Sequence, residues 1–172
     1  PDGGILIKNI KRFPASVNPF ISAALKKAGL IFFRDADFLN WRYADCPTHH
    51  YELYLVRLGV KIIGYFVLRF RQKGNLNIGC IIDILCDLDE TQRWDTLIRQ
   101  IENICLIRKI DIVQTLATHK IYQAALVKAN FSITKKVNFL YFIKNESLSQ
   151  KLKKIEKHWF FTMGDGDFEM ED

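Results

Sequence analysis

The sequence lacks any pair of cysteines at the C-x-x-C spacing typical of zinc ribbons and thioredoxin-like redox sites. The stretch 46–50 (CPTHH) offers one cysteine and two histidines, but no second ligand pair of matching spacing follows it. Cys80, Cys86 and Cys105 lie among apolar residues, where a thiol behaves as a small core side chain. We therefore predict no metal site, free thiols and a reducing compartment, most simply the cytoplasm.

Long uncharged apolar runs are also missing. The longest apolar stretch, Ile78–Leu85, is interrupted by Asp83 and is far shorter than the roughly 18 residues that a membrane-spanning helix needs. The chain shows no signal peptide, and it begins at Pro1 rather than at methionine, so we expect an excised domain or a processed product. With 49% hydrophobic and 26% charged residues, its composition excludes a disordered or collagen-like chain.

Positive charge exceeds negative charge. The chain has 25 Lys and Arg against 19 Asp and Glu, a net charge of +6, which allows an anionic partner such as a nucleic acid or a nucleotide phosphate. Arg69 and Arg71 flank Phe70, but residues two apart share one strand face, so nucleic acid is the least supported partner. Lysines gather in the last third of the chain, before an acidic tail: Lys135, Lys136, Lys144, Lys151, Lys153, Lys154 and Lys157, then Asp165, Asp167, Glu169, Glu171 and Asp172.

The length of 172 residues predicts a single domain over the whole range 1–172. Such a chain buries about two-thirds of its unfolded surface and needs no disulfide or metal to hold a core. Within it, residues 145–157 are predicted to form a basic helix or linker, and residues 164–172 an acidic tail.

Alternating apolar residues predict three adjacent antiparallel strands in the middle of the chain. They cover 51–57, 61–71 and 76–85, and turns at Gly59 and Gly74 join them. A long helix follows, from a cap at Asp89 or Thr91 to about Arg108, with one apolar stripe of Trp94, Leu97, Ile98, Ile101, Ile104 and Cys105.

The helix leads to an apolar strand over 111–116, which a helical crossover should place parallel to the strand over 76–85. Trp94 and Trp159 are expected in the core, and Trp41 with less support. The remaining elements are predicted as strands over 5–12, 132–143 and 158–163, and as helices over 20–27, 36–43, 121–129 and 151–157.

This order of elements resembles the fold of the GNAT acyltransferases over essentially the whole chain. The segments DADFLNWRYADCP, IIGYFVLR, GCIIDIL and WFFTMGDGDFE are similar to a subgroup of GNAT-like domains, some of which form the second half of two-domain proteins. The resemblance implies a mixed α/β fold, with a central, mostly antiparallel sheet of about seven strands. The sheet would be splayed at its middle and flanked by about four helices. A second GNAT-like domain, outside this chain, is a partner that it implies.

The resemblance also implies a cofactor, acetyl-CoA or another acyl-CoA. Its pantetheine arm would lie along the main chain of Ile84, Leu85 and Cys86, where the strand over 79–86 splays from the segment 112–116. Its pyrophosphate would lie at the start of the long helix, on Thr91, Gln92 and Arg93.

Two features depart from the pattern of the family. The family's pyrophosphate loop carries glycines, whereas residues 87–94 contain none and include Asp87, Asp89 and Glu90, whose charges oppose a phosphate. The family's Gly-Phe pair is replaced by Asn130-Phe131, and Leu126 stands where many relatives have the tyrosine that protonates the leaving thiolate.

The candidate catalytic residues are Asp83, Glu52 and Tyr122. Asp83 is a lone carboxylate in an apolar strand, where burial raises a carboxyl pKa toward that of a general base, although pairing with Arg42 is an alternative. Glu52 is a second candidate base. Tyr122 lies one helical turn before Leu126 and is the candidate acid. His119 is expected to cap the short helix or to line the cleft.

Three functions stay open. The first is an N-acyltransferase domain that transfers an acyl group from acyl-CoA to an amine substrate. The second is a catalytically silent GNAT-like module that packs on, or regulates, a partner domain. The third, nucleic-acid binding, depends only on the lysine cluster.

Overall fold

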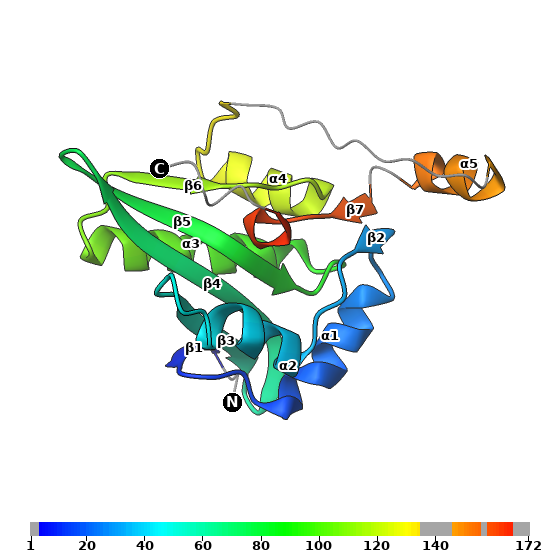
Figure 1. Cartoon of the computed structure of the whole chain (residues 1–172), viewed down its shortest axis with the longest axis horizontal. Coiled ribbons are helices and arrows are strands. Elements are labelled where there is room, and N and C mark those ends of the chain that lie inside the picture. Colours follow the sequence, from blue (N-terminus) through cyan, green and yellow to red (C-terminus); the bar gives the residue numbers. More distant parts are fainter. Residues whose placement is uncertain (1–3, 135–145, 156–157, 167–172) are drawn as a thin grey trace.

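The computed structural model describes residues 4–134, 146–155 and 158–166. Among them, the main sheet has five strands in the order β1-β3-β4-β5-β6, and β2 and β7 form a separate parallel pair (Figure 1). The strands are β1 (Ile5–Ile10), β2 (Leu30–Ile31), β3 (Glu52–Leu58), β4 (Lys61–Lys73), β5 (Leu76–Cys86), β6 (Ile112–Thr115) and β7 (Trp159–Phe160). The helices are η1 (Ala15–Val17), α1 (Asn18–Leu25), α2 (Ala36–Leu39), η2 (Asn40–Ala44), α3 (Thr91–Ile107), α4 (Lys120–Lys128), α5 (Glu146–Lys154) and η4 (Met163–Asp165).

The predicted meander is confirmed as β3, β4 and β5, each antiparallel to the next. Gly59 and Gly74 both have a φ of +58°, in the left-handed region that glycine adopts without strain, which explains why the chain turns at these two positions. The parallel pairing of β5 with β6 is also confirmed, and α3 supplies the crossover between them. The expected class, a mixed and mostly antiparallel sheet flanked by helices, is therefore correct.

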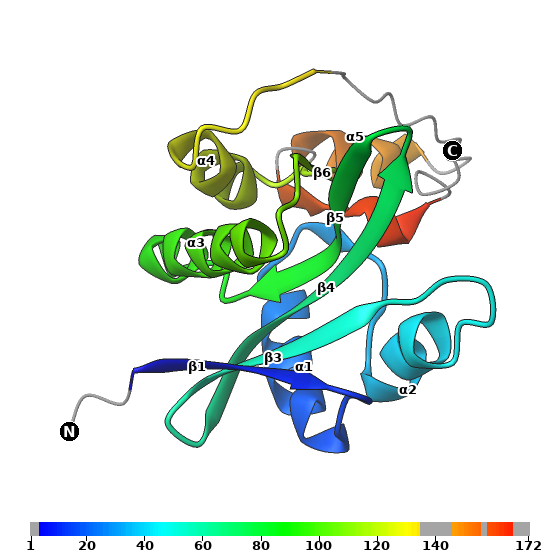
Figure 2. The same cartoon turned by 90° about the vertical axis from the view of Figure 1, so that its left-hand side faces the viewer.

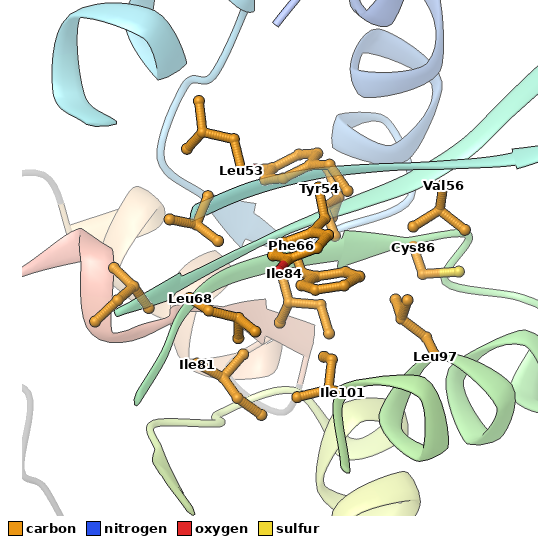
Figure 3. Close-up of a cluster of buried hydrophobic side chains, with 14 of the residues drawn as sticks. Leu53, Tyr54, Val56, Phe66, Leu68, Ile81, Ile84, Cys86, Leu97 and Ile101 are labelled. Atoms are coloured by element: carbon orange, nitrogen blue, oxygen red, sulfur yellow. The ribbon is translucent and has the colours of Figure 1, made fainter. Parts of the chain in front are cut away.

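One face of the sheet packs on α3. Phe66 of β4 and Ile84 of β5 point toward Leu97 and Ile101 of α3, and all four side chains are buried (Figure 3). The view in Figure 2 shows α3 and α4 near the end of the sheet that carries β5 and β6, and α1 and α2 near the end that carries β1 and β3. The predicted apolar stripe of α3 forms the core contact, as its periodicity required.

Some local predictions need correction. Trp41 is 67% exposed, so it is not a core residue, whereas Trp94 and Trp159 are buried as expected. The predicted helix over 36–43 is a short α2 continued by η2, a π-helical turn from Asn40 to Ala44. The predicted strand over 132–143 lies largely outside the described residues. Asn130 has a φ of +62°, so it adopts the left-handed conformation at the end of α4, which asparagine tolerates better than most residues.

None of the helices in the described residues could span a membrane, and no group of three or more His, Cys, Asp or Glu side chains there is arranged to hold a metal ion.

Candidate functional site

The site begins at a β-bulge in β5. In the pairing with β4, Val67 lies opposite Asp83 and Leu68 lies opposite Ile81, so Ile82 is an extra residue. A bulge of this kind re-aims the side chains around it. The pairing with β6 ends nearby, at Ile81 and Thr115, and β5 continues to Cys86 without β6 beside it. β6 is therefore paired with β5 along its whole length, Ile112–Thr115, and the predicted splay of β5 from the segment 112–116 stays a prediction.

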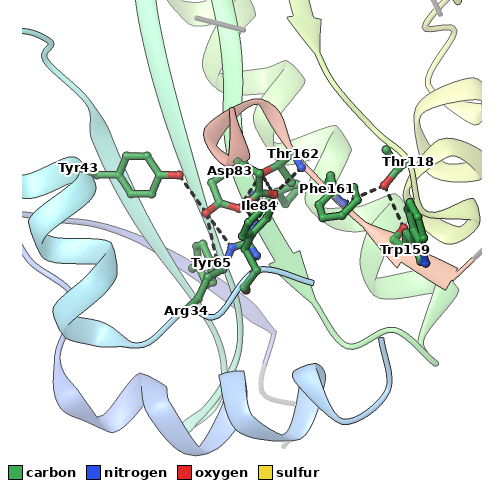
Figure 4. Close-up of polar contacts among 11 residues, drawn as sticks. Arg34, Tyr43, Tyr65, Asp83, Ile84, Thr118, Trp159, Phe161 and Thr162 are labelled. Carbon is green, nitrogen blue, oxygen red and sulfur yellow. Dashed lines mark hydrogen bonds and ion pairs between the residues drawn. The ribbon is translucent and has the colours of Figure 1, made fainter. Parts of the chain in front are cut away.

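The bulge places the Asp83 carboxylate in a completely buried polar cluster (Figure 4). Its Oδ1 accepts from the Ile84 backbone N–H at 2.8 Å and from the Thr162 hydroxyl at 3.2 Å. Its Oδ2 accepts from Arg34 Nε at 3.2 Å and from the hydroxyls of Tyr43 at 3.1 Å and Tyr65 at 3.3 Å.

Arg34 is the cation of this cluster, and the prediction that Arg42 pairs with Asp83 was wrong. The Arg34 side chain is 1% exposed and contacts two carboxylates: Nε bonds to Asp83, and Nη2 bonds to Asp165 at 2.6 and 2.7 Å. Burial acts to lower the pKa of Arg34, but the two facing carboxylates more than reverse this and raise it well above its usual value.

The second carboxylate belongs to the C-terminal strap, which we define as residues 162–165. Its single 3₁₀ turn is closed by a reciprocal capping box, because the Thr162 and Asp165 side chains each bond to the other's backbone. A Cβ atom on Gly164 would overlap the Tyr43 hydroxyl and would lie 3.3 Å from the Ile82 carbonyl oxygen. The strap thus lies directly against the bulge, and burial raises the pKa of Asp165 despite its bond to Arg34.

Aromatic side chains pack together on the α3 side, beside β5 and β6. Phe160 of β7 lies with its ring 6.0 Å from Trp94 and 6.5 Å from Tyr122, and all three are fully buried. The Tyr122 hydroxyl shares a 2.8 Å hydrogen bond with Thr115 Oγ1, which also donates to the Ile81 carbonyl. Burial raises the pKa of Tyr122, which makes it a weaker acid than a free tyrosine.

The start of α3 is acidic. Lys27 pairs with Asp87 at 2.6 Å and with Asp89 at 2.7 Å, and Arg93 approaches Asp87 and Glu90 at 3.6 and 3.8 Å. Burial acts to raise the pKa of Asp87, but its bond to Lys27 outweighs this and lowers it.

An acyl-CoA pyrophosphate does not fit these residues. Three carboxylates face two cations at the helix start, so a phosphate near Thr91 and Gln92 would compete with Asp87 and Asp89 for Lys27 and Arg93. In addition, the Ile84 N–H is already bonded to the Asp83 carboxylate.

The other predicted residues lie apart from Asp83. Glu52 accepts hydrogen bonds from the Tyr54 hydroxyl at 2.6 Å and from Arg108, at the end of α3, at 2.8 Å. Glu52 therefore belongs to the α3 face of the sheet, whereas Asp83 faces Tyr43 and the strap. His119 caps α4 by accepting from the Ile121 N–H, as expected, and burial with the nearby His158 lowers its pKa to about 4.

Sequence reasoning missed Arg34, Tyr43, Tyr65, Thr162 and Asp165 as members of the site. Arg34 lies between β2 and α2, outside any periodic pattern, and it is 131 residues from Asp165. The sequence offered one signal for these residues: a carboxylate inside an apolar strand requires a buried cation to balance its charge.

Comparison with known proteins identifies the architecture. No protein-family model and no curated protein matches the chain. Among solved structures, the glucosamine-6-phosphate N-acetyltransferase of Arabidopsis thaliana is similar with a TM-score of 0.56 and 13% identity, over 81% of this chain and 99% of that one.

Two further solved structures are similar to the same extent. The ribosomal-protein-alanine N-acetyltransferase of Brucella melitensis biovar Abortus 2308 has a TM-score of 0.55 and 14% identity, over 81% of this chain and 99% of that one. An aminoglycoside acetyltransferase from an uncultured soil metagenomic sample has a TM-score of 0.51 and 14% identity, over 81% and 97%. At such identities, the likeness shows a shared fold and no more.

Proposed function

We propose that this divergent GNAT-like domain, whose fold is that of the N-acetyltransferases above, serves as a binding module that acts on a partner domain and does not itself transfer acyl groups. One observation carries the proposal: both oxygens of the Asp83 carboxylate are already engaged by hydrogen bonds from this chain. A fold that is widely used for acyl transfer does not by itself confer that activity.

A general base needs a free lone pair within hydrogen-bond reach of the proton that it removes. For Asp83 to accept an amine proton, at least one of its buried hydrogen bonds would have to break. Hydrogen bonds to charged groups contribute about 1.5–3 kcal/mol each, and more is lost when the partner stays buried and unpaired. Arg34, Tyr43 and Tyr65 thus hold the Asp83 side chain in a structural role.

The cofactor side supports the same conclusion. Phosphate groups bind well at helix N-termini that present free backbone N–H groups in a positive field. The start of α3 instead carries Asp87, Asp89 and Glu90 beside Lys27 and Arg93, an excess of one negative charge.

Titration of the full chain with acetyl-CoA, followed by calorimetry and thermal unfolding, tests the proposal. We expect no heat of binding and no rise in Tm at 1 mM acetyl-CoA, a concentration that would raise the Tm if the dissociation constant were about 10 µM or tighter. An acetyltransferase that binds CoA, run alongside, shows that the assay detects binding. A rise in Tm together with release of free CoA in the presence of amines, both lost in Lys27→Glu, would contradict it.

A second candidate function, acyl transfer from acyl-CoA to an amine, is favoured by a different observation: β5 runs beyond its pairing with β6, from Ile82 to Cys86. Its test uses Asp83→Asn, Glu52→Gln and Tyr122→Phe. This candidate requires measurable turnover in the unmodified chain and a loss of turnover, without unfolding, in at least one of the three variants.

A further inference from the structure

The C-terminal strap lies over the bulge of β5 with a carboxylate, Asp165, on the buried guanidinium of Arg34. The structure assigns to Arg34 a carboxylate-binding site: we propose that the strap occupies it in cis and that a carboxylate-bearing ligand takes the place of Asp165 when the strap is displaced. This inference deepens the proposed binding function by naming the class of ligand.

The donors of this site are arranged for two carboxylates. One edge of the Arg34 guanidinium, Nε, bonds to Asp83, which belongs to the sheet and is fixed by Tyr43 and Tyr65. Nη2 contacts both oxygens of Asp165. A guanidinium has five N–H donors in a planar fork that suits carboxylate oxygens, so the position of Asp165 is a preformed recognition site.

The two carboxylates are held differently. Asp83 accepts bonds from Arg34, Tyr43, Tyr65 and its own neighbour Ile84 as well as from Thr162 of the strap, whereas, among the residues that the structure describes, Asp165 is bonded to Arg34 and to Thr162 of its own turn. One cation faces two anions, so the second carboxylate is in electrostatic excess, and the raised pKa of Asp165 is consistent with this. The strap is consequently the replaceable partner and Asp83 the permanent one.

The close contact at Gly164 shows how the strap lies against the bulge of β5. Gly164 fits against the Tyr43 hydroxyl and the Ile82 carbonyl only because it has no side chain. Any larger residue there must move the strap away from β5 or displace the Tyr43 phenol, while Arg34, Asp83 and the two tyrosines lie on other segments. Gly164→Ala is therefore expected to open the site without removing any residue of it.

The first experiment uses a chain ending at Phe161 and a synthetic peptide of residues 162–172. We expect calorimetry to detect binding of the peptide to the shortened chain. The same peptide with Asp165→Asn should bind about tenfold more weakly or worse, since a charge-assisted bidentate contact is lost. A matched peptide with Asp172→Asn keeps the same change of charge elsewhere and should bind normally. Equal binding of the Asp165→Asn peptide, or no binding to a folded shortened chain, overturns the proposal.

The second experiment uses the full chain and does not depend on the shortened one. Acetate, with acetamide as its uncharged control, is added to the unmodified chain and to Gly164→Ala during thermal unfolding at constant ionic strength. We expect acetate to raise the Tm of Gly164→Ala by several degrees more than acetamide does, and to leave the unmodified chain unchanged. The same response to both additives, or failure of both altered chains to fold, would show that the strap is a part of the core and not an occupant of a site. Neither outcome depends on acetyl-CoA, so this test stands apart from that of the proposed function.

Discussion

The two faces of β5 are stabilised by different means. On one face, Ile84 packs with Phe66 against Leu97 and Ile101 of α3, an apolar contact whose strength follows the area removed from water. On the other face, one residue away, Asp83 is buried in a cluster of ions and hydroxyls. The apolar face tolerates a change in proportion to the volume lost, whereas the polar face depends on every partner being present.

The largest effect should come from removing the cation of the polar face. Arg34→Met leaves Asp83 and Asp165 buried without a counter-charge, and a broken buried pair typically destabilises by about 3–5 kcal/mol. Urea unfolding of Arg34→Met measures this, with Arg108→Met as the control, because Arg108 pairs with Glu52 at a site where its side chain is 43% exposed. If Arg34→Met lowers the free energy of unfolding by less than about 1 kcal/mol, the usual range for surface ion pairs, the two faces of β5 do not differ as described.

Truncation on the apolar face should have the next largest effect. Ile101→Ala removes a fully buried side chain from the contact between α3 and the sheet, and such changes destabilise by about 2–5 kcal/mol according to how well the cavity closes. Leu106→Ala, on the same helix but 72% exposed, should change the free energy of unfolding by less than about 0.5 kcal/mol. If Ile101→Ala and Leu106→Ala lower the free energy of unfolding by similar amounts, α3 does not cover this face of the sheet.

A smaller effect should follow acidification, through His119. Its folded pKa of about 4 lies below the usual value near 6.5, so the unfolded chain binds more protons between these pH values. Stability is therefore complete above about pH 6.5 and falls as the pH drops toward 4, by about 1–2 kcal/mol after allowing for partial solvation. His119→Asn keeps an N-cap side chain without the titration, and its unfolding free energy should fall less over this window. An equal fall in both proteins would assign the effect to other groups.

The smallest effect is expected at the start of α3. Lys27→Met removes a partly exposed partner of Asp87 and Asp89, and pairs of this kind contribute about 0–1 kcal/mol. Double-mutant cycles with Asp89→Asn would measure the coupling, which should shrink when salt is raised to 1 M. If the coupling energy between Lys27 and Asp89 is unchanged at high salt, the pair is shielded from solvent, as the Arg34 pair is, and the prediction of an exposed pair is wrong.

Local patterns in the sequence predicted most of the architecture. Alternating apolar residues predicted β3, β4 and β5, the stripe from Trp94 to Cys105 predicted α3, and glycine predicted the two tight turns. These signals work because each depends on neighbours within a few residues along the chain.

The site was less predictable, because its contacts join distant segments. Asp83 was identified from its unusual place in an apolar strand, but its cation is 49 residues away and the strap is 79 residues away. The pairing of β2 with β7 is only two residues long, too short to leave an alternating pattern. Trp41 was placed in the core because its size favours burial, whereas the π-helical turn that contains it directs Tyr43 inward instead.

That turn fixes the rotation of everything that follows it. An α-helix advances by about 100° per residue, and a π-helical turn accommodates one residue more than an α-helical turn of the same rise. If the same residues, with none deleted, were wound as a regular α-helix, those that follow would be over-rotated by up to about 100°, and the Tyr43 phenol would turn away from the Asp83 carboxylate that it now meets. The irregular winding thus sets the direction of the Tyr43 phenol, which a regular helix of the same residues would point elsewhere.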